Sequence, residues 1–90
     1  MKRYVIERDI PGVGKLDRKQ LKDISAKSVN VLAKMSGIQW VQSYIAADKT
    51  FCVYLAENED LIREHARLAE FPVTKITVAL TVIDPMTAFS

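Results

Sequence analysis

Residues 3–10 alternate between apolar and polar side chains with a period of two, which is typical of a strand with one buried face. The apolar side carries Tyr4, Ile6 and Ile10. The second side carries Val5, Glu7 and Asp9. Arg8 is a polar exception on the apolar side. The pattern predicts a strand whose apolar side joins the core and whose other face is polar.

A helix is predicted after the turn residues at 11–14, beginning near Arg18. Asp17 and Gln20 have the spacing of a capping box, in which a carboxylate does the work of Ser or Thr. Side chains at three- and four-residue spacing form one apolar stripe along this helix, namely Leu21, Ile24, Ser28, Val31, Leu32 and Met35. Gly37 is a natural C-terminal stop.

The second half of the chain predicts a hairpin, a helix and a last strand. Residues 38–46 and 51–56 are rich in β-branched and aromatic side chains and are joined by the polar stretch AADKT. Acidic and capping residues at 57–60 begin a helix that runs to about Ala69. Residues 75–83 alternate again, as a strand does.

The resulting order is βαββαβ, the ferredoxin-like α+β pattern. It predicts a four-stranded antiparallel sheet with two helices on one face, in a single domain spanning residues 1–90. The other face of the sheet would be uncovered. Aromatic residues on that face, which we expect to be Trp40, Tyr44 and Tyr54, would leave an apolar patch larger than monomers usually carry. We therefore expect a homodimer formed face to face.

Strand phase predicts which side chains share the uncovered face. On the third strand, Phe51, Val53 and Leu55 are expected to face the helices, which turns Cys52 and Tyr54 away from them. On the second strand Val41 and Ile45 make the better core pair, which turns Trp40, Gln42 and Tyr44 outward.

The predicted strand phase brings together three side chains that carry reactive or ligand-forming groups. The first strand lies beside the third in this topology, and a hairpin turn centred near Asp48 places Tyr44 opposite Cys52. Glu7, Tyr44 and Cys52 are then neighbours on the uncovered face.

The composition argues against several classes of protein but does not identify the function. The 90 residues are 49% hydrophobic and 27% charged, and no segment is apolar over the roughly 18 residues of a membrane span, so we expect a soluble protein. MKRYVIERD lacks the apolar stretch of a signal peptide, which favours the cytoplasm. One cysteine excludes a disulfide within the chain. A net charge of +2, with no basic run, argues against nucleic-acid binding.

Four segments together resemble, in order and spacing, a family of small bacterial ferredoxin-like proteins of largely unassigned role that are described as nickel-binding. They are YVIERDIPGVGKL, IQWVQSYIAADKTFCVYLA, IREHARLAEFP and IDPMTA. The resemblance covers nearly the whole chain and implies a homodimer related to the dimeric α/β-barrel superfamily, with a capacity to bind a transition metal. One departure is visible: the family commonly has a glycine pair before Phe-Pro, where this chain has Ala69 and Glu70.

The resemblance and the strand phase together suggest a site for nickel or a similar divalent ion. The candidate ligands are Glu7, Cys52, Asp9, Tyr44 and His65. Each has an ordinary alternative. Cys52 could be a small hydrophobe at the interface, His65 a core histidine on the helix behind the sheet, and the carboxylates partners of Arg3 or Arg8 across the dimer.

A second function class stays open, namely an enzyme or small-molecule-binding protein with a pocket at the uncovered face walled by Trp40, Gln42 and Tyr54. No catalytic triad, phosphate loop or cofactor motif supports catalysis. The only candidate acid and base groups are Glu7, Asp9 and His65. A third class is a purely structural module that binds a partner. Binding of a metal ion is the preferred hypothesis.

Overall fold

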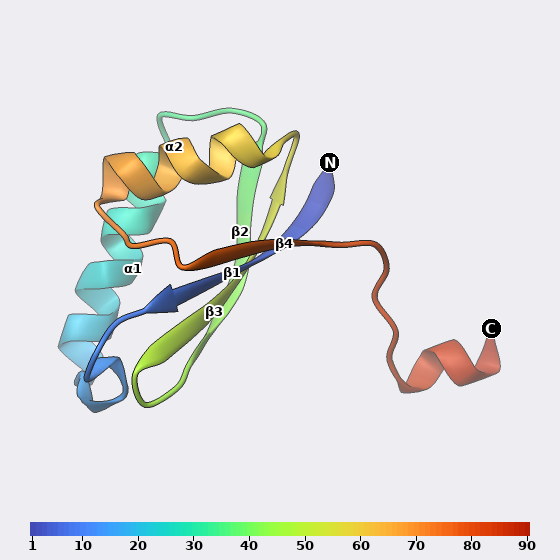
Figure 1. Cartoon of the computed structure of the whole chain (residues 1–90), viewed down its shortest axis with the longest axis horizontal. Helices are drawn as coiled ribbons and strands as arrows, with labels where there is room; N and C mark the ends of the chain where they lie inside the picture. The colour runs from blue at the N-terminus through green and yellow to red at the C-terminus, as the bar shows by residue number, and fades with distance from the viewer.

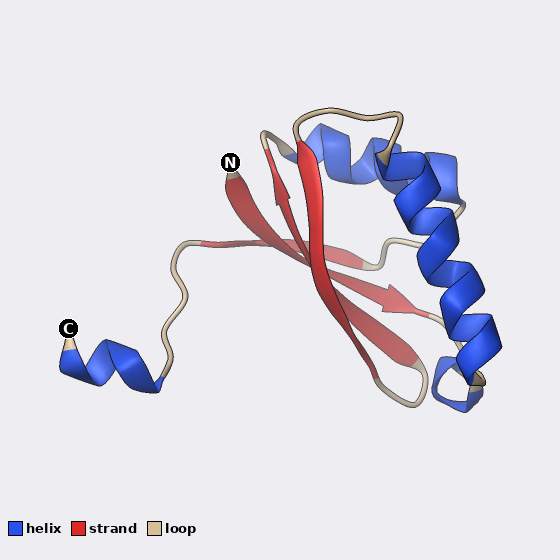
Figure 2. Cartoon of the chain, turned by 180° about the vertical axis from the view of Figure 1, so that it is seen from behind, coloured by secondary structure: helices blue, strands red, loops and turns tan.

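A computed structural model describes residues 1–90 as a four-stranded sheet with two helices. The elements in chain order are β1 (Lys2–Asp9), the 3-10 turn η1 (Val13–Lys15), α1 (Arg18–Leu32), β2 (Ile38–Ile45), β3 (Lys49–Ala56), α2 (Glu59–Ala69), β4 (Lys75–Ala79) and the 3-10 turn η2 (Pro85–Phe89). The strand order is β2-β3-β1-β4 and every pair is antiparallel. Both helices lie on the same side of the sheet (Figures 1 and 2). The predicted ferredoxin-like fold is confirmed.

The two helices begin where their capping residues predict. Asp17 and Gln20 make both bonds of a capping box, since each side chain accepts from the backbone N–H of the other, at 2.8 and 3.0 Å. Asn58 caps α2 by accepting from the N–H of Leu61 at 3.0 Å. Helix α1 ends at Leu32, earlier than the expected stop at Gly37, which adopts a left-handed conformation with φ 79° in the following loop.

The core lies between the sheet and the helices, and the two helices contribute to it unequally. Its buried members are Tyr4, Ile6, Ile38, Cys52, Tyr54, Ala56 and Ile62. Helix α2 buries Ile62, His65, Ala66 and Ala69. Helix α1 buries only Ser28, and its apolar residue Ile24 stays substantially exposed. Helix α2 therefore closes the core, whereas α1 leaves much of its apolar stripe without close packing.

The predicted phase of β3 is wrong by one residue. Cys52 pairs with Ile6 and Tyr54 pairs with Tyr4, so both face the helices and are buried. Phe51 pairs with Glu7 on the uncovered face. Both faces of β3 carry apolar side chains, so its alternation does not distinguish the buried face from the uncovered one.

The turn between β2 and β3 fixes this register. It closes through the N–H of Ala46, which donates to the carbonyl of Lys49 at 2.8 Å, so its centre lies half a residue before Asp48. The segment after β1 holds the turn in place, because the N–H of Gly14 donates to the carbonyl of Ala47 at 2.9 Å. A Cβ at Gly14 would lie only 2.8 Å from the carbonyl oxygen of Ala46, so this close approach requires glycine. Tyr44 is consequently opposite Phe51 rather than Cys52.

Strand β2 contains a bulge at Val41, which its alternation of side chains does not predict. Trp40 pairs with Tyr54, and the next pair joins Gln42 to Val53, so Val41 has no partner and is 46% exposed. Trp40 therefore faces the helices, and the predictions that it faces outward and that Val41 joins the core are wrong. Gln42 faces away from the helices as predicted.

The chain beyond β4 leaves the body of the molecule. Strand β4 ends at Ala79, short of the predicted Ile83, and residues 80–90 extend away from the sheet to η2 (Figure 1). The large apolar side chains of this segment are exposed, namely Leu80, Val82, Ile83, Met86 and Phe89. We call residues 80–90 the C-terminal arm. Each helix is too short or too polar to span a membrane.

Candidate functional site

The structure does not bring the predicted metal ligands together. Glu7, Asp9 and Tyr44 lie on the uncovered face, whereas Cys52 and His65 lie between the sheet and the helices. The predicted neighbourhood of Glu7, Tyr44 and Cys52 is therefore wrong, because of the phase of β3. No three His, Cys, Asp or Glu side chains of the chain are grouped so that they could hold a metal ion.

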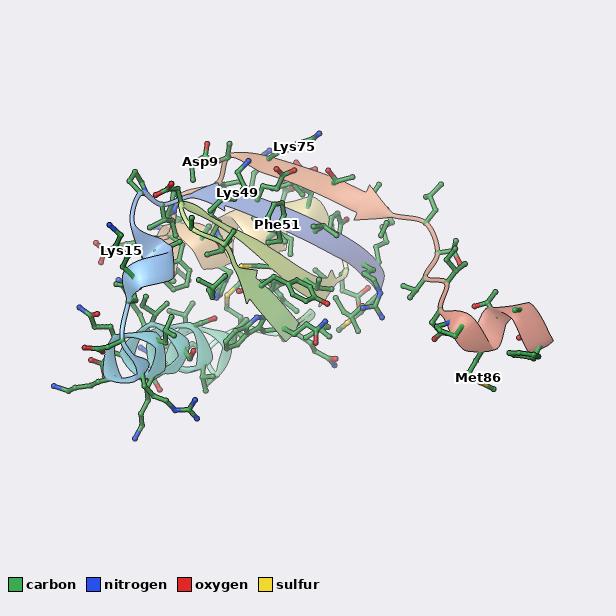
Figure 3. All side chains as sticks on the ribbon, turned by 90° about the horizontal axis from the view of Figure 1, so that it is seen from below. Asp9, Lys15, Lys49, Phe51, Lys75 and Met86 are labelled. Atoms are coloured by element: carbon green, nitrogen blue, oxygen red, sulfur yellow. The ribbon has the colours of Figure 1, made fainter.

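The uncovered face holds a compact group of charges at one end of β1. The Lys49 ammonium lies 3.3 Å from Oε1 of Glu7 and 3.6 Å from Oδ1 of Asp9, so one cation contacts both carboxylates. Lys75 pairs with Glu7 across the β1–β4 ladder. Lys49 also lies 5.8 Å from the centre of the Phe51 ring. Figure 3 shows the labelled side chains of Asp9, Lys49, Lys75 and Phe51 around this part of the sheet. We call Glu7, Asp9 and Lys49 the carboxylate group.

Tyr44 lies on the same face but outside the carboxylate group. It is opposite Phe51 on the β2 side, and Glu7 is opposite Phe51 on the β1 side, so Phe51 separates the two. The hydroxyl of Tyr44 accepts from Nε2 of Gln42 at 2.6 Å. Within one chain, Tyr44 is therefore a neighbour of Gln42 rather than of the carboxylates.

The covered face contains a second polar group, centred on His65. This residue is fully buried, and its Nε2 lies 3.1 Å from Oγ of Ser28. Its ring contacts those of Tyr54 and Phe71, with centroids 5.1 and 6.0 Å away. Burial, and next the positive charge of Arg8, lower the pKa of His65 to about 4, so the imidazole is neutral near pH 7. The alternative of a hydrogen-bonded core histidine is observed, with Ser28 as its partner.

Arg8 also belongs to this second group, and it faces the helices rather than the uncovered face where it was considered as a partner of the carboxylates across the dimer. It is only 2% exposed, and no carboxylate contacts it. Nη1 donates to the carbonyl of Pro72 at 2.8 Å, and the guanidinium lies 5.3 Å from the centre of the Phe71 ring. Nη2 is buried and has no hydrogen-bond partner. Its position on the apolar side of an alternating strand was the signal that could have identified it.

A cavity of about 80 Å³ separates α1 from the sheet beside Arg8. Its walls are mostly apolar, and they include Leu21 and Ile24 of α1 and Trp40 and Ile45 of β2. Cys52 and Tyr54 also line it, together with the hydroxyl-bearing residues Ser28 and Thr50. Burial raises the pKa of Tyr54, which keeps its hydroxyl protonated. The predicted pocket walls Trp40 and Tyr54 therefore line a cavity, but on the helix-covered face and without Gln42.

Comparisons with known proteins identify a family. No curated protein matches the chain. The structure is similar to the crystal structure of SCO4226 from Streptomyces coelicolor A3(2), with a TM-score of 0.76 and 11% sequence identity, over 90% of this chain and 99% of that chain. This similarity supports the shared fold. The family described as "Nickel responsive protein SCO4226-like" matches residues 4–78, which confirms the resemblance found in the sequence. The chain belongs to the SCO4226-like family.

Proposed function

We propose that the protein binds a divalent transition-metal ion, nickel first, as a homodimer whose uncovered sheet faces meet. The observation that carries the proposal is the carboxylate group, in which two carboxylates of an uncovered face converge on a single cation. The name of the family, nickel responsive, supplies the choice of metal.

The carboxylate group has the charge and the ligand atoms that a divalent ion needs. Carboxylate oxygens bind hard and borderline divalent cations, and Lys49 occupies the position between them with a single charge. An arriving ion would displace the flexible Lys49 ammonium, which is partly solvent-exposed and contributes little to stability as a surface ion pair.

One chain supplies too few ligands for such an ion, which supports a site shared between two chains. Glu7 and Asp9 are two donors, and transition metals in proteins commonly take four to six. A two-fold axis through the uncovered face would bring a second copy of each residue toward the first. Tyr44 is the further oxygen donor on this face, available from either subunit.

The same face has the apolar character of a subunit interface. Val5, Phe51, Val53 and Leu55 point away from the helices and stay only partly buried within one chain. The large apolar side chains of the C-terminal arm are exposed as well. A homodimer would cover both of these surfaces.

Cys52 and His65 are less suited to hold the ion in this arrangement. They lie behind the sheet near the buried cation Arg8, whose positive charge opposes a second cation in a region of low dielectric constant. We therefore propose Glu7 and Asp9 as ligands and packing roles for Cys52 and His65.

Metal content after gel filtration tests this assignment. We expect the wild type to retain nickel and the Glu7→Gln and Asp9→Asn variants to lose at least tenfold in affinity, because each removes a charged donor. Glu59→Gln, an exposed change on α2, is the matched control. Retention of nickel at wild-type affinity in both variants, with loss in Cys52→Ala or His65→Gln, would move the site to the covered face. Parallel titrations with zinc, copper and cobalt measure selectivity.

A further inference from the structure

We propose that the cavity between α1 and the sheet binds a small organic anion, a monocarboxylate with a short apolar tail, whose carboxylate pairs with Arg8. This inference is independent of the metal proposal, since it concerns the opposite face of the sheet and a ligand of opposite charge.

The charge of Arg8 is the first argument. Its guanidinium is buried and contacts a carbonyl, an aromatic ring and the neutral Tyr54 hydroxyl, none of which carries a charge, and its Nη2 has no hydrogen-bond partner. A buried charge without a counter-ion is unfavourable. No acid of the chain supplies one: Glu7 and Asp9 are held by Lys49 on the other face, and Glu64 pairs with Arg67. A water molecule would satisfy the N–H but not the charge, whereas a carboxylate satisfies both.

The lining of the cavity matches such a ligand, because it is polar at one end and apolar at the other. Three buried residues that carry hydroxyl groups line the cavity together with Arg8, namely Ser28, Thr50 and Tyr54. The apolar walls Ile24 and Ile45 are partly exposed, and they mark the solvent side. A ligand would therefore enter with its carboxylate first and leave its apolar tail between α1 and β2.

The size of the cavity limits the ligand to a few heavy atoms. One ordered water needs about 10–15 Å³ of such space, so 80 Å³ corresponds to roughly five to eight waters, or to a short carboxylic acid. Inorganic phosphate fits less well, because a single guanidinium would leave part of its charge unpaired among apolar walls. An apolar tail would also pack against the side chains of α1 that the chain itself leaves loosely packed.

Titration of the full chain with butyrate tests the proposal, with butyramide as a neutral probe of the same shape and inorganic phosphate as a second anion. We expect saturable binding of butyrate, seen as chemical-shift changes of residues lining the cavity and as a higher melting temperature. Butyramide and phosphate should bind at least tenfold more weakly. Equal binding of butyrate and butyramide, or no saturable binding of butyrate, would overturn the proposal.

Two variants separate recognition by Arg8 from effects on folding. Arg8→Met removes the charge and keeps an unbranched side chain of similar length, and we expect it to lose butyrate binding at least tenfold. Ser25→Leu fills the cavity from α1 without changing Arg8, and we expect a similar loss with an unchanged circular dichroism spectrum. Arg63→Met, on the exposed side of α2, is the matched control. Wild-type binding by a folded Arg8→Met or, if that variant does not fold, by Ser25→Leu would contradict the proposal.

Discussion

His65 and Arg8 are polar residues buried in the same region, and the charge of Arg8 acts on the protonation of His65. His65 is neutral because burial and the adjacent guanidinium both disfavour the imidazolium. Guanidinium groups are permanent cations in proteins. At the residue scale the covered face therefore holds one permanent positive charge.

His65 should make the protein less stable in mild acid. In the unfolded chain its pKa is about 6.5, and in the folded chain it is about 4, so the unfolded state binds more protons between these values. The contribution of neutral His65 to the free energy of unfolding is complete above about pH 6.5. It falls by about 3 kcal/mol as the pH is lowered to 4. Urea unfolding at several pH values measures how steeply the free energy of unfolding depends on pH. This slope should be shallower in His65→Gln. Equal slopes for the two proteins would show that His65 is not responsible.

The sequence identified the residue types of the site better than their positions. Glu7 and Asp9 lie on the uncovered face as predicted, because β1 has one apolar and one polar side. Cys52 was misplaced because β3 is apolar on both sides, and a difference of half a residue in the centre of the turn exchanges its faces. Lys49 was not foreseen as the partner of the carboxylates, since its position depends on that same register.

At the element scale, capping signals and hydrophobic periodicity predicted the order of helices and strands, and local irregularities were missed. The bulge at Val41 reverses the facing of Trp40, and no glycine or proline marks it. The end of α2 shows the departure noted in the sequence. Glu70 has φ 59°, a left-handed conformation that favours glycine, and the N–H of Phe71 donates to the carbonyl of Ala66 at 2.9 Å.

Replacing Glu70 with glycine should stabilise the protein. A side chain in the left-handed region costs about 1 kcal/mol relative to glycine, which is partly offset by the greater freedom of glycine in the unfolded chain. We expect Glu70→Gly to raise the free energy of unfolding by about 0.5 kcal/mol, measured by urea denaturation. Glu70→Ala is the control, because it removes the carboxylate near Lys27 but keeps the Cβ. A gain in Glu70→Ala equal to that in Glu70→Gly would assign the effect to charge instead.

At the scale of the whole molecule, one face of the sheet is closed by helices and the other is left to a second subunit in our proposal. Substituting Val53, near the middle of the uncovered face, with lysine should then separate the subunits, because a charge there would be buried without a partner. Light scattering should give half the wild-type mass for Val53→Lys at equal concentration. Val29→Lys, a change on the exposed side of α1, should keep the dimer mass. A monomeric wild type would contradict the proposed assembly.

The proposed metal ligands lie on the face where the two subunits are proposed to meet, so metal binding and assembly would depend on each other. Anomalous diffraction at the nickel absorption edge, from a crystal grown with nickel, tests the metal proposal most directly. We expect a peak between two copies of the chain, bound by Glu7 and Asp9, with the Lys49 ammonium displaced from these two carboxylates. A peak beside Cys52 or His65, or none in a crystal saturated with nickel, would contradict it.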